Sequence, residues 1–167
     1  MQQLRLKYWI ALSLLFLFSC EKDDICVDGD TPLLIITFFD IDNTTVAKAV
    51  PALRVSSGDL GPPSTFTDRS SLDSIAIPLR VDTNTTTFSF ITNSADDADA
   101  METGNIDMLT FNYETQEVFI SRACGFIANY DNLTDSLTED DENWILDIEI
   151  VTPLVENSNA AHVQIFH

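Results

Sequence analysis

The chain is poor in basic residues, in histidine and in glycine. Of its 167 residues, eight are Lys or Arg, two are His and five are Gly, against 27 acidic residues, which leaves a formal net charge of −19. So negative a chain repels nucleic acid and anionic membrane faces, which argues against both as partners. The negative charge remains compatible with cationic partners, with divalent ions, or with a role in solvation alone. Because glycine is scarce, we expect Asn and Asp to supply most turns.

The motifs of common enzyme classes are also missing. The sequence has no Gly-x-Ser-x-Gly elbow and no glycine-rich phosphate loop. His162 and His167 stand five residues apart on an expected strand, so they would point to opposite faces, which disfavours a zinc site. We therefore predict no catalytic residue, no cofactor and no resident metal. A carboxylate pair of the glycosidase kind stays open, because its members can come from distant strands.

The one long hydrophobic run is too short to cross a bilayer. Residues 8–18 form an 11-residue run that is apolar except for Ser13, whereas a membrane-spanning helix needs roughly 20 residues. Arg5 and Lys7 precede the run, and Leu17-Phe18-Ser19-Cys20 follows it in a pattern that resembles a lipobox. We predict that residues 1–19 are a lipoprotein signal peptide and that Cys20 receives the lipid.

An acidic tether is predicted to follow, over residues 20–31. Its Lys22-Asp23-Asp24 is similar to the signal that sends Bacteroidota lipoproteins to the cell surface, whereas a plain solvated tether is the simpler interpretation. We expect an outer-membrane lipoprotein that is exposed on the cell surface or, failing that, faces the periplasm. The lipid on Cys20 would be its membrane contact.

Cysteine usage agrees with export. With Cys20 acylated, Cys26 and Cys124 remain, and an even pair in an oxidising compartment favours a disulfide. The alternative is that Cys26 lies in a mobile tether and stays a free thiol. A bridge would close a loop of nearly a hundred residues.

Residues 32–167 are predicted to form one all-β domain. Short apolar or alternating runs separated by turn residues favour strands, and no long stretch has a helical period. The expected strands cover residues 33–39 (buried on both faces), 50–55, 72–79, 85–92, 106–113, 117–123, 144–150 and 161–166. Residues 114–116 are expected to close a hairpin. The segment 131–143 is acidic, and its helically spaced Leu133 and Leu137 are too few for more than one helical turn. This predicts a single antiparallel β-sandwich of about eight strands, with a barrel as the alternative.

The acidic loops raise the question of calcium. Asp96, Asp97 and Asp99 lie close together, and residues 139–142 are all acidic. Adjacent carboxylates repel each other until a cation neutralises them. They are weak calcium candidates, and a solvated loop is the favoured interpretation. Ser74 and Ser136 match a short pattern of bacterial O-glycosylation.

Several segments together resemble an uncharacterised family of short Bacteroidota lipoproteins. The residues that carry the resemblance are Cys26, Asp30-Thr31-Pro32-Leu33, Phe38-Phe39-Asp40, Ile77-Pro78-Leu79-Arg80, Thr85-Thr86-Thr87-Phe88, Phe111-Asn112-Tyr113, Ser121-Arg122-Ala123-Cys124-Gly125-Phe126 and Ala161-His162-Val163. The resemblance implies a place in the envelope and supplies no catalytic residue. We expect a non-catalytic binding or scaffolding module with a protein or glycan partner. The alternatives are a subunit of a larger envelope complex and a carboxylate-dependent glycan-active enzyme.

Overall fold

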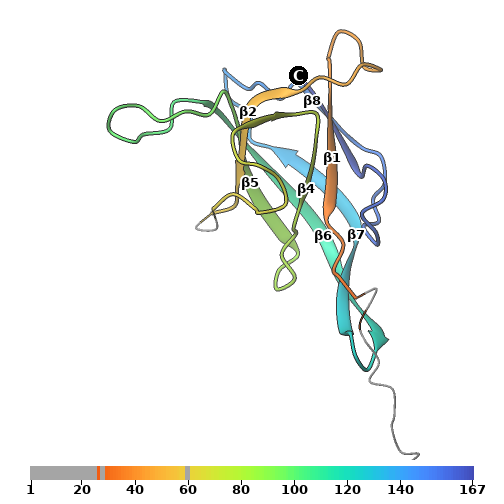
Figure 1. Ribbon diagram of the computed structural model, residues 1–167. Helices are drawn as coiled ribbons and strands as arrows, with labels where there is room; N and C mark the ends of the chain where they lie inside the picture. Colours follow the sequence, from red (N-terminus) through yellow and green to blue (C-terminus); the bar gives the residue numbers. More distant parts are fainter. Residues whose placement is uncertain (1–25, 27–28, 59–60) are drawn as a thin grey trace, which may run out of the picture.

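The protein folds into nine strands and, within the part of the chain that the structure describes, no helix. The structure is a computed structural model, and it describes residues 26, 29–58 and 61–167 (Figure 1). The strands are β1 (Leu34–Phe39), β2 (Val50–Ser56), β3 (Ser70–Leu72), β4 (Ser74–Ile77), β5 (Thr85–Thr92), β6 (Asn105–Ser121), β7 (Gly125–Leu137), β8 (Asp147–Ile150) and β9 (Val163–Phe166). Among these residues, no helix long and apolar enough to cross a membrane is found.

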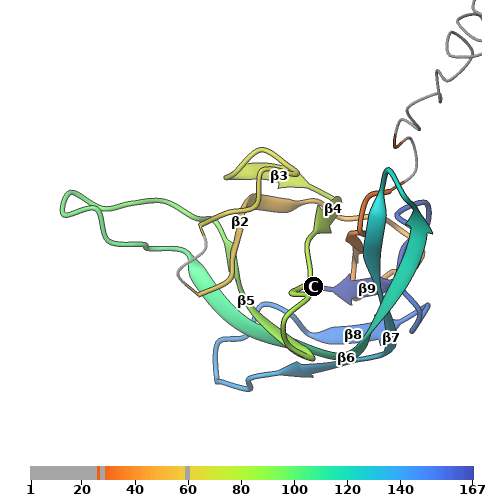
Figure 2. The ribbon, with the colours of Figure 1, turned by 90° about the horizontal axis from the view of Figure 1, so that it is seen from below.

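Two sheets pack face to face. One has the strand order β4-β1-β9-β8 and the other β3-β2-β5-β6-β7 (Figure 2). This confirms the predicted β-sandwich over the barrel, with nine strands in place of about eight. Neighbouring strands are antiparallel except β1 and β9, which run parallel.

The core lies between the sheets and is rich in aromatic residues. Phe38, Phe90, Phe111 and Tyr130 are among its largest fully buried side chains. Along β1, buried and half-buried residues alternate. The expectation that this strand is buried on both faces was therefore wrong. Its second face is only partly covered, because β1 belongs to an outer layer rather than to a central sheet.

The segment 72–79 was predicted as one strand and is in fact split. Ser70–Leu72 pairs with β2 in one sheet, whereas Ser74–Ile77 pairs with β1 in the other. The chain passes from sheet to sheet at Asp73, whose carbonyl accepts a hydrogen bond from the amide of Phe38 at 2.9 Å. The apolar period changes at the crossing, since Leu72 and Ile75 stand three residues apart around Asp73-Ser74. This shift of phase was the signal in the sequence that one strand ends and another begins.

The alternation predicted for residues 144–150 fails at its start. In the sequence, Trp144, Leu146, Ile148 and Ile150 alternate against Asp147 and Glu149, which predicts that Leu146 faces the core. Instead Ile145 is buried and Leu146 is 59% exposed, and β8 begins only at Asp147. The amide of Ile145 donates to Oδ2 of the buried Asp107 at 2.8 Å. This bond draws Ile145 inward before the strand begins.

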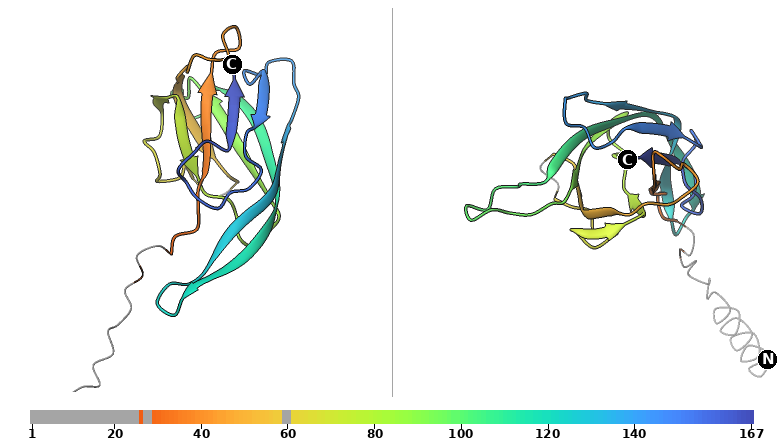
Figure 3. Two further views of the ribbon diagram at one scale, coloured as in Figure 1. Left: turned by 90° about the vertical axis from the view of Figure 1, so that its right-hand side faces the viewer. Right: turned by 90° about the horizontal axis from the view of Figure 1, so that it is seen from above.

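The hairpin predicted about residues 114–116 does not exist. Instead β6 continues through these residues and pairs with β7 from Leu109 to Ser121. The turn lies at Arg122-Ala123-Cys124, and Gly125 follows it with a φ of +73°, a conformation that favours glycine. The outer half of this long hairpin projects beyond the rest of the sandwich (Figure 3).

Candidate functional site

The tip of the projecting hairpin carries an exposed aromatic pair. Phe119 in β6 lies opposite Phe126 in β7, and the two rings meet edge to face with centroids 5.3 Å apart. The side chains are 56% and 66% exposed. Phe is ordinarily a core residue, so two large aromatic side chains together in solvent indicate a contact surface.

The other face of the hairpin lines a groove of about 780 Å³. Because side chains alternate along a strand, Val118 and Ile120 point away from Phe119. They form one wall with Ile127, and the opposite walls come from the segment before β1 and the segment before β9. The full lining is Asp30, Thr31, Pro32, Leu33, Val118, Ile120, Ile127, Asn129, Glu156, Asn157 and Ser158.

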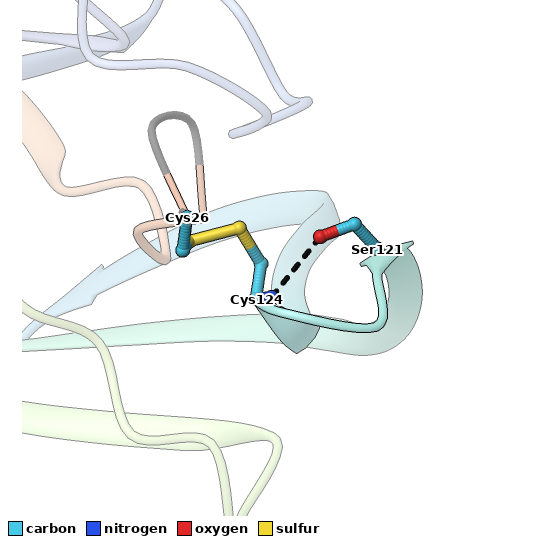
Figure 4. Close-up of a disulfide and its surroundings, with 3 residues drawn as sticks. All are labelled: Cys26, Ser121 and Cys124. Carbon is cyan, nitrogen blue, oxygen red and sulfur yellow. Dashed lines mark hydrogen bonds between the residues drawn. A yellow bond between two sulfur atoms is a disulfide. The ribbon is translucent and has the colours of Figure 1, made fainter. Parts of the chain in front are cut away.

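A disulfide ties the hairpin turn to the start of the described chain. Cys26 is bonded to Cys124, with their Cα atoms 4.8 Å apart (Figure 4). The amide of Cys124 donates to Oγ of Ser121 at 3.0 Å, which closes the turn. The pairing predicted from the cysteine count is confirmed. It places the hairpin tip beside Cys26, which lies within the predicted tether of residues 20–31.

The charge of the tip differs from that of the rest of the chain. Residues 118–128 contain no Asp or Glu, and their only charged residue is Arg122. Arg122 is exposed at the turn. The tip is therefore an apolar, weakly basic surface on a strongly acidic protein.

A second cavity, of about 350 Å³, lies at the end of the sandwich near the β4–β5 connection. Its lining is mainly apolar and includes Pro78, Leu79 and Phe88. Arg80 and Asp82 stand at this cavity and pair with each other at 2.9 Å, which lowers the pKa of the Asp82 carboxyl. The charges of Arg80 and Asp82 at this cavity are thus neutralised within one ion pair.

The three calcium candidates are engaged in other interactions or solvated. Both oxygens of Asp96 accept hydrogen bonds from Arg69. Oδ1 of Asp97 accepts from the amides of Asp99 and Met101, both at 2.9 Å, which is turn chemistry. Asp99 itself is exposed.

The acidic residues that follow β7 border an open part of the surface. Asp140, Asp141 and Glu142 line an open hollow beside residues 103–106. Across the described ranges, no group of three or more His, Cys, Asp or Glu residues is placed to hold a metal ion.

Besides tyrosines, two titratable side chains of the described residues are buried in the sandwich, His162 and Asp107. His162 is 3% exposed, and burial lowers the pKa of its imidazole. Its Nδ1 accepts a hydrogen bond from the amide of Ile35 at 3.0 Å. Asp107 is fully buried, and burial raises the pKa of its carboxyl. Each of the two side chains accepts a hydrogen bond from a backbone amide, that of Ile35 in one case and that of Ile145 in the other. Both side chains are shielded from solvent.

The predicted lipidation and export residues lie outside the described residues. These are Cys20, Lys22, Asp23 and Asp24, together with the predicted signal peptide. Their roles remain predictions.

Sequence reasoning missed the aromatic tip. It assigned residues 117–123 to a strand that pairs with residues 106–113, and it did not predict that Phe119 and Phe126 are exposed. The signal that was present is a doublet, Phe119-Ile120 and Phe126-Ile127, on the two sides of the Arg-Ala-Cys-Gly turn. Such mirror-related aromatic residues around a turn indicate a cross-strand pair.

A protein-family model described as a family of unknown function, DUF6452, matches residues 53–167. The match covers the hairpin and Cys124 but begins after Cys26. Comparison with curated proteins and with solved structures gives no match.

Proposed function

We propose that this chain, which belongs to the DUF6452 family of unknown function, is an outer-membrane lipoprotein that serves as a non-catalytic binding or scaffolding module. Its anchor would be a lipid on Cys20, and Lys22-Asp23-Asp24 would direct it to the cell surface. Its docking element is the hairpin tip, defined here as residues 118–128.

The observation that carries the proposal is the exposed pair of Phe119 and Phe126 on a braced hairpin. A docking surface works best when little conformational freedom is lost on contact. The tip meets this condition, because β6 and β7 pair up to the turn and the disulfide fixes the turn to the chain start. The burial of His162 and Asp107 supports a non-catalytic role, since a substrate would not reach either group.

The anchoring part is tested by Cys20→Ser in the native host. We expect this variant to leave the outer-membrane fraction and to lose the mass of the acyl chains. Protease treatment of intact cells should degrade the wild-type protein if it faces outward, while a periplasmic control protein survives. Unchanged fractionation and mass for Cys20→Ser would contradict the lipoprotein assignment.

The docking part is tested with a photoreactive residue at position 126 in living cells. We expect adducts with an envelope component from this position. Position 101, on the distant loop between β5 and β6, is the matched control, because Met101 is 64% exposed. Equal adduct yields at the two positions would contradict a docking role for the hairpin tip.

If the adducts at position 126 join one envelope protein in a fixed ratio, the chain is a subunit of a larger complex. The exposed aromatic pair favours this second function as well, since such surfaces are buried in permanent assemblies. The ratio in a purified complex separates a fixed subunit from a transient binder.

A further inference from the structure

We propose that the hairpin tip rests in the lipid interface of the same bilayer that holds Cys20, so that the domain contacts the membrane at two points. This inference rests on the proposed lipid anchor. It names the partner of the docking surface as the bilayer itself.

The first argument is the length of chain between the anchor and the tip. Cys26 follows Cys20 after five intervening residues. Over these six Cα–Cα steps the two Cα atoms are at most about 22 Å apart. The disulfide then places the Cα atom of Cys124 only 4.8 Å from that of Cys26. The hairpin turn is therefore the part of the sandwich that the anchor keeps closest to the membrane surface.

The second argument is chemical complementarity. Interfacial membrane segments bury aromatic and aliphatic side chains and keep cationic groups at the headgroups. Phe119 and Phe126 supply the exposed aromatic surface, and Arg122 supplies a cation that can reach lipid phosphates. The 118–128 segment has no carboxylate that the bilayer would repel.

The third argument is the direction in which the hairpin projects. The tip and the described N-terminal segment lie at the same end of the molecule, and the C-terminus and the β1–β2 connection lie at the other (Figures 1 and 3). A second contact at the tip would stop the sandwich from swinging on its tether. The loops at the opposite end would then always face away from the membrane.

The test uses the full-length, lipidated protein in vesicles of phosphatidylethanolamine and phosphatidylglycerol. Phe126→Trp reports contact with lipid, because bromine on the acyl chains quenches a tryptophan that enters the bilayer. Met101→Trp is the matched control on the distant exposed loop, and the wild type gives the background from Trp144. Thermal unfolding confirms that each variant is folded. If Phe126→Trp does not fold, Phe119→Trp takes its place.

We expect Phe126→Trp to lose emission in brominated vesicles, and Met101→Trp to keep it. Flotation of the vesicles separates the two claims. Protein that floats without loss of emission at position 126 overturns the tip contact and leaves the anchor standing. Protein that does not float overturns the anchor and this inference with it.

A protein partner is distinguished in living cells. A photoreactive residue at position 126 should form adducts with phospholipid. Adducts with a protein and none with lipid would overturn the inference.

Discussion

Tyr113 and Tyr130 meet edge to face in the core, with ring centroids 5.0 Å apart, and their hydroxyls donate to two consecutive carbonyls. Tyr130 donates to Leu79 at 3.1 Å and Tyr113 to Arg80 at 2.9 Å. The two strands of the long hairpin thereby hold the connection between β4 and β5. This contact fixes one wall of the apolar cavity that includes Leu79 and Arg80.

Removing one of these hydroxyls tests how strongly the connection is held. Tyr130→Phe should lower the free energy of unfolding by about 1–2 kcal/mol, because the buried carbonyl of Leu79 loses its donor. Urea unfolding measures this. The control is Thr87→Val, which removes a hydroxyl on the exposed face of β5 and should change stability by less than about 0.5 kcal/mol. Equal stability of Tyr130→Phe and wild type would contradict the prediction. Burial also raises the pKa of Tyr130 to about 12, which an absorbance titration can follow.

The sequence predicted the sandwich because most of its strands alternate against the core. The alternation of Phe88, Phe90, Leu109 and Phe111 reports one buried face, and all four side chains are buried. The prediction of strands from alternation failed where a strand extends beyond the core. From Glu114 outward β6 is no longer buried on one face, so its residues need not alternate. Thr115 and Gln116 then resemble a turn although they are paired strand residues.

The candidate site was predictable only in part. The pairing of Cys26 with Cys124 follows from composition and compartment. The exposure of Phe119 and Phe126 does not, because a Phe beside a β-branched residue has the same pattern in a core strand and in a projecting one. Only the position of the turn distinguishes the two, and its single local signal is Gly125.

Stability should fall in mild acid because of His162. Burial lowers the pKa of this imidazole in the folded state, so the unfolded chain binds the proton more readily. The free energy of unfolding should therefore be fully retained above about pH 6.5 and decrease below it, by up to about 1.4 kcal/mol per pH unit. Urea unfolding at pH 7.5, 6.5 and 5.5 measures this.

The matched control is His162→Asn. The Asn Oδ1 atom can accept the hydrogen bond from the amide of Ile35 and does not titrate. This variant should lose most of the dependence on pH between 7.5 and 5.5. The same dependence in both proteins would assign the effect to another group.

Asp107 should have the opposite dependence. Burial raises the pKa of its carboxyl, although hydrogen bonds from residues 143–145 oppose the shift. Since the folded state binds the proton more tightly, this group reduces stability as the pH rises from 3.8 through the folded pKa. Asp107→Asn keeps an acceptor for the amide of Ile145 and removes the charge. At pH 7 it should be as stable as wild type or more stable.

Asp107→Ala is the contrasting variant, since it removes the acceptor as well. It should lower the free energy of unfolding by about 1–3 kcal/mol, because the buried amide of Ile145 is left without a partner. Thermal unfolding at pH 7 ranks the three proteins. Asp107→Asn as unstable as Asp107→Ala would mean that the charge itself is required.

The disulfide requires glycine at position 29. A Cβ atom there would stand 2.7 Å from both Cβ and Sγ of Cys124, and closer still to Sγ of Cys26. Gly29→Ala should therefore force the bridge to shift and lower the free energy of unfolding. In the chain-entropy model, a disulfide that closes a loop of 98 residues stabilises the fold by about 4–5 kcal/mol. The loss of stability in Cys26→Ser/Cys124→Ser, which lacks the disulfide, is therefore the upper limit for the effect of Gly29→Ala on the bridge.

A double-mutant cycle isolates this contact from any other effect of the alanine. In the Cys26→Ser/Cys124→Ser background the bridge is gone, the two side chains can move apart, and Gly29→Ala should cost much less. Gly61→Ala is the matched glycine control, since a Cβ atom at position 61 meets nothing within 4 Å. Intact mass after alkylation without reductant counts the free thiols in each protein. An equal cost of Gly29→Ala with and without the cysteines would show that the glycine serves the backbone and not the bridge.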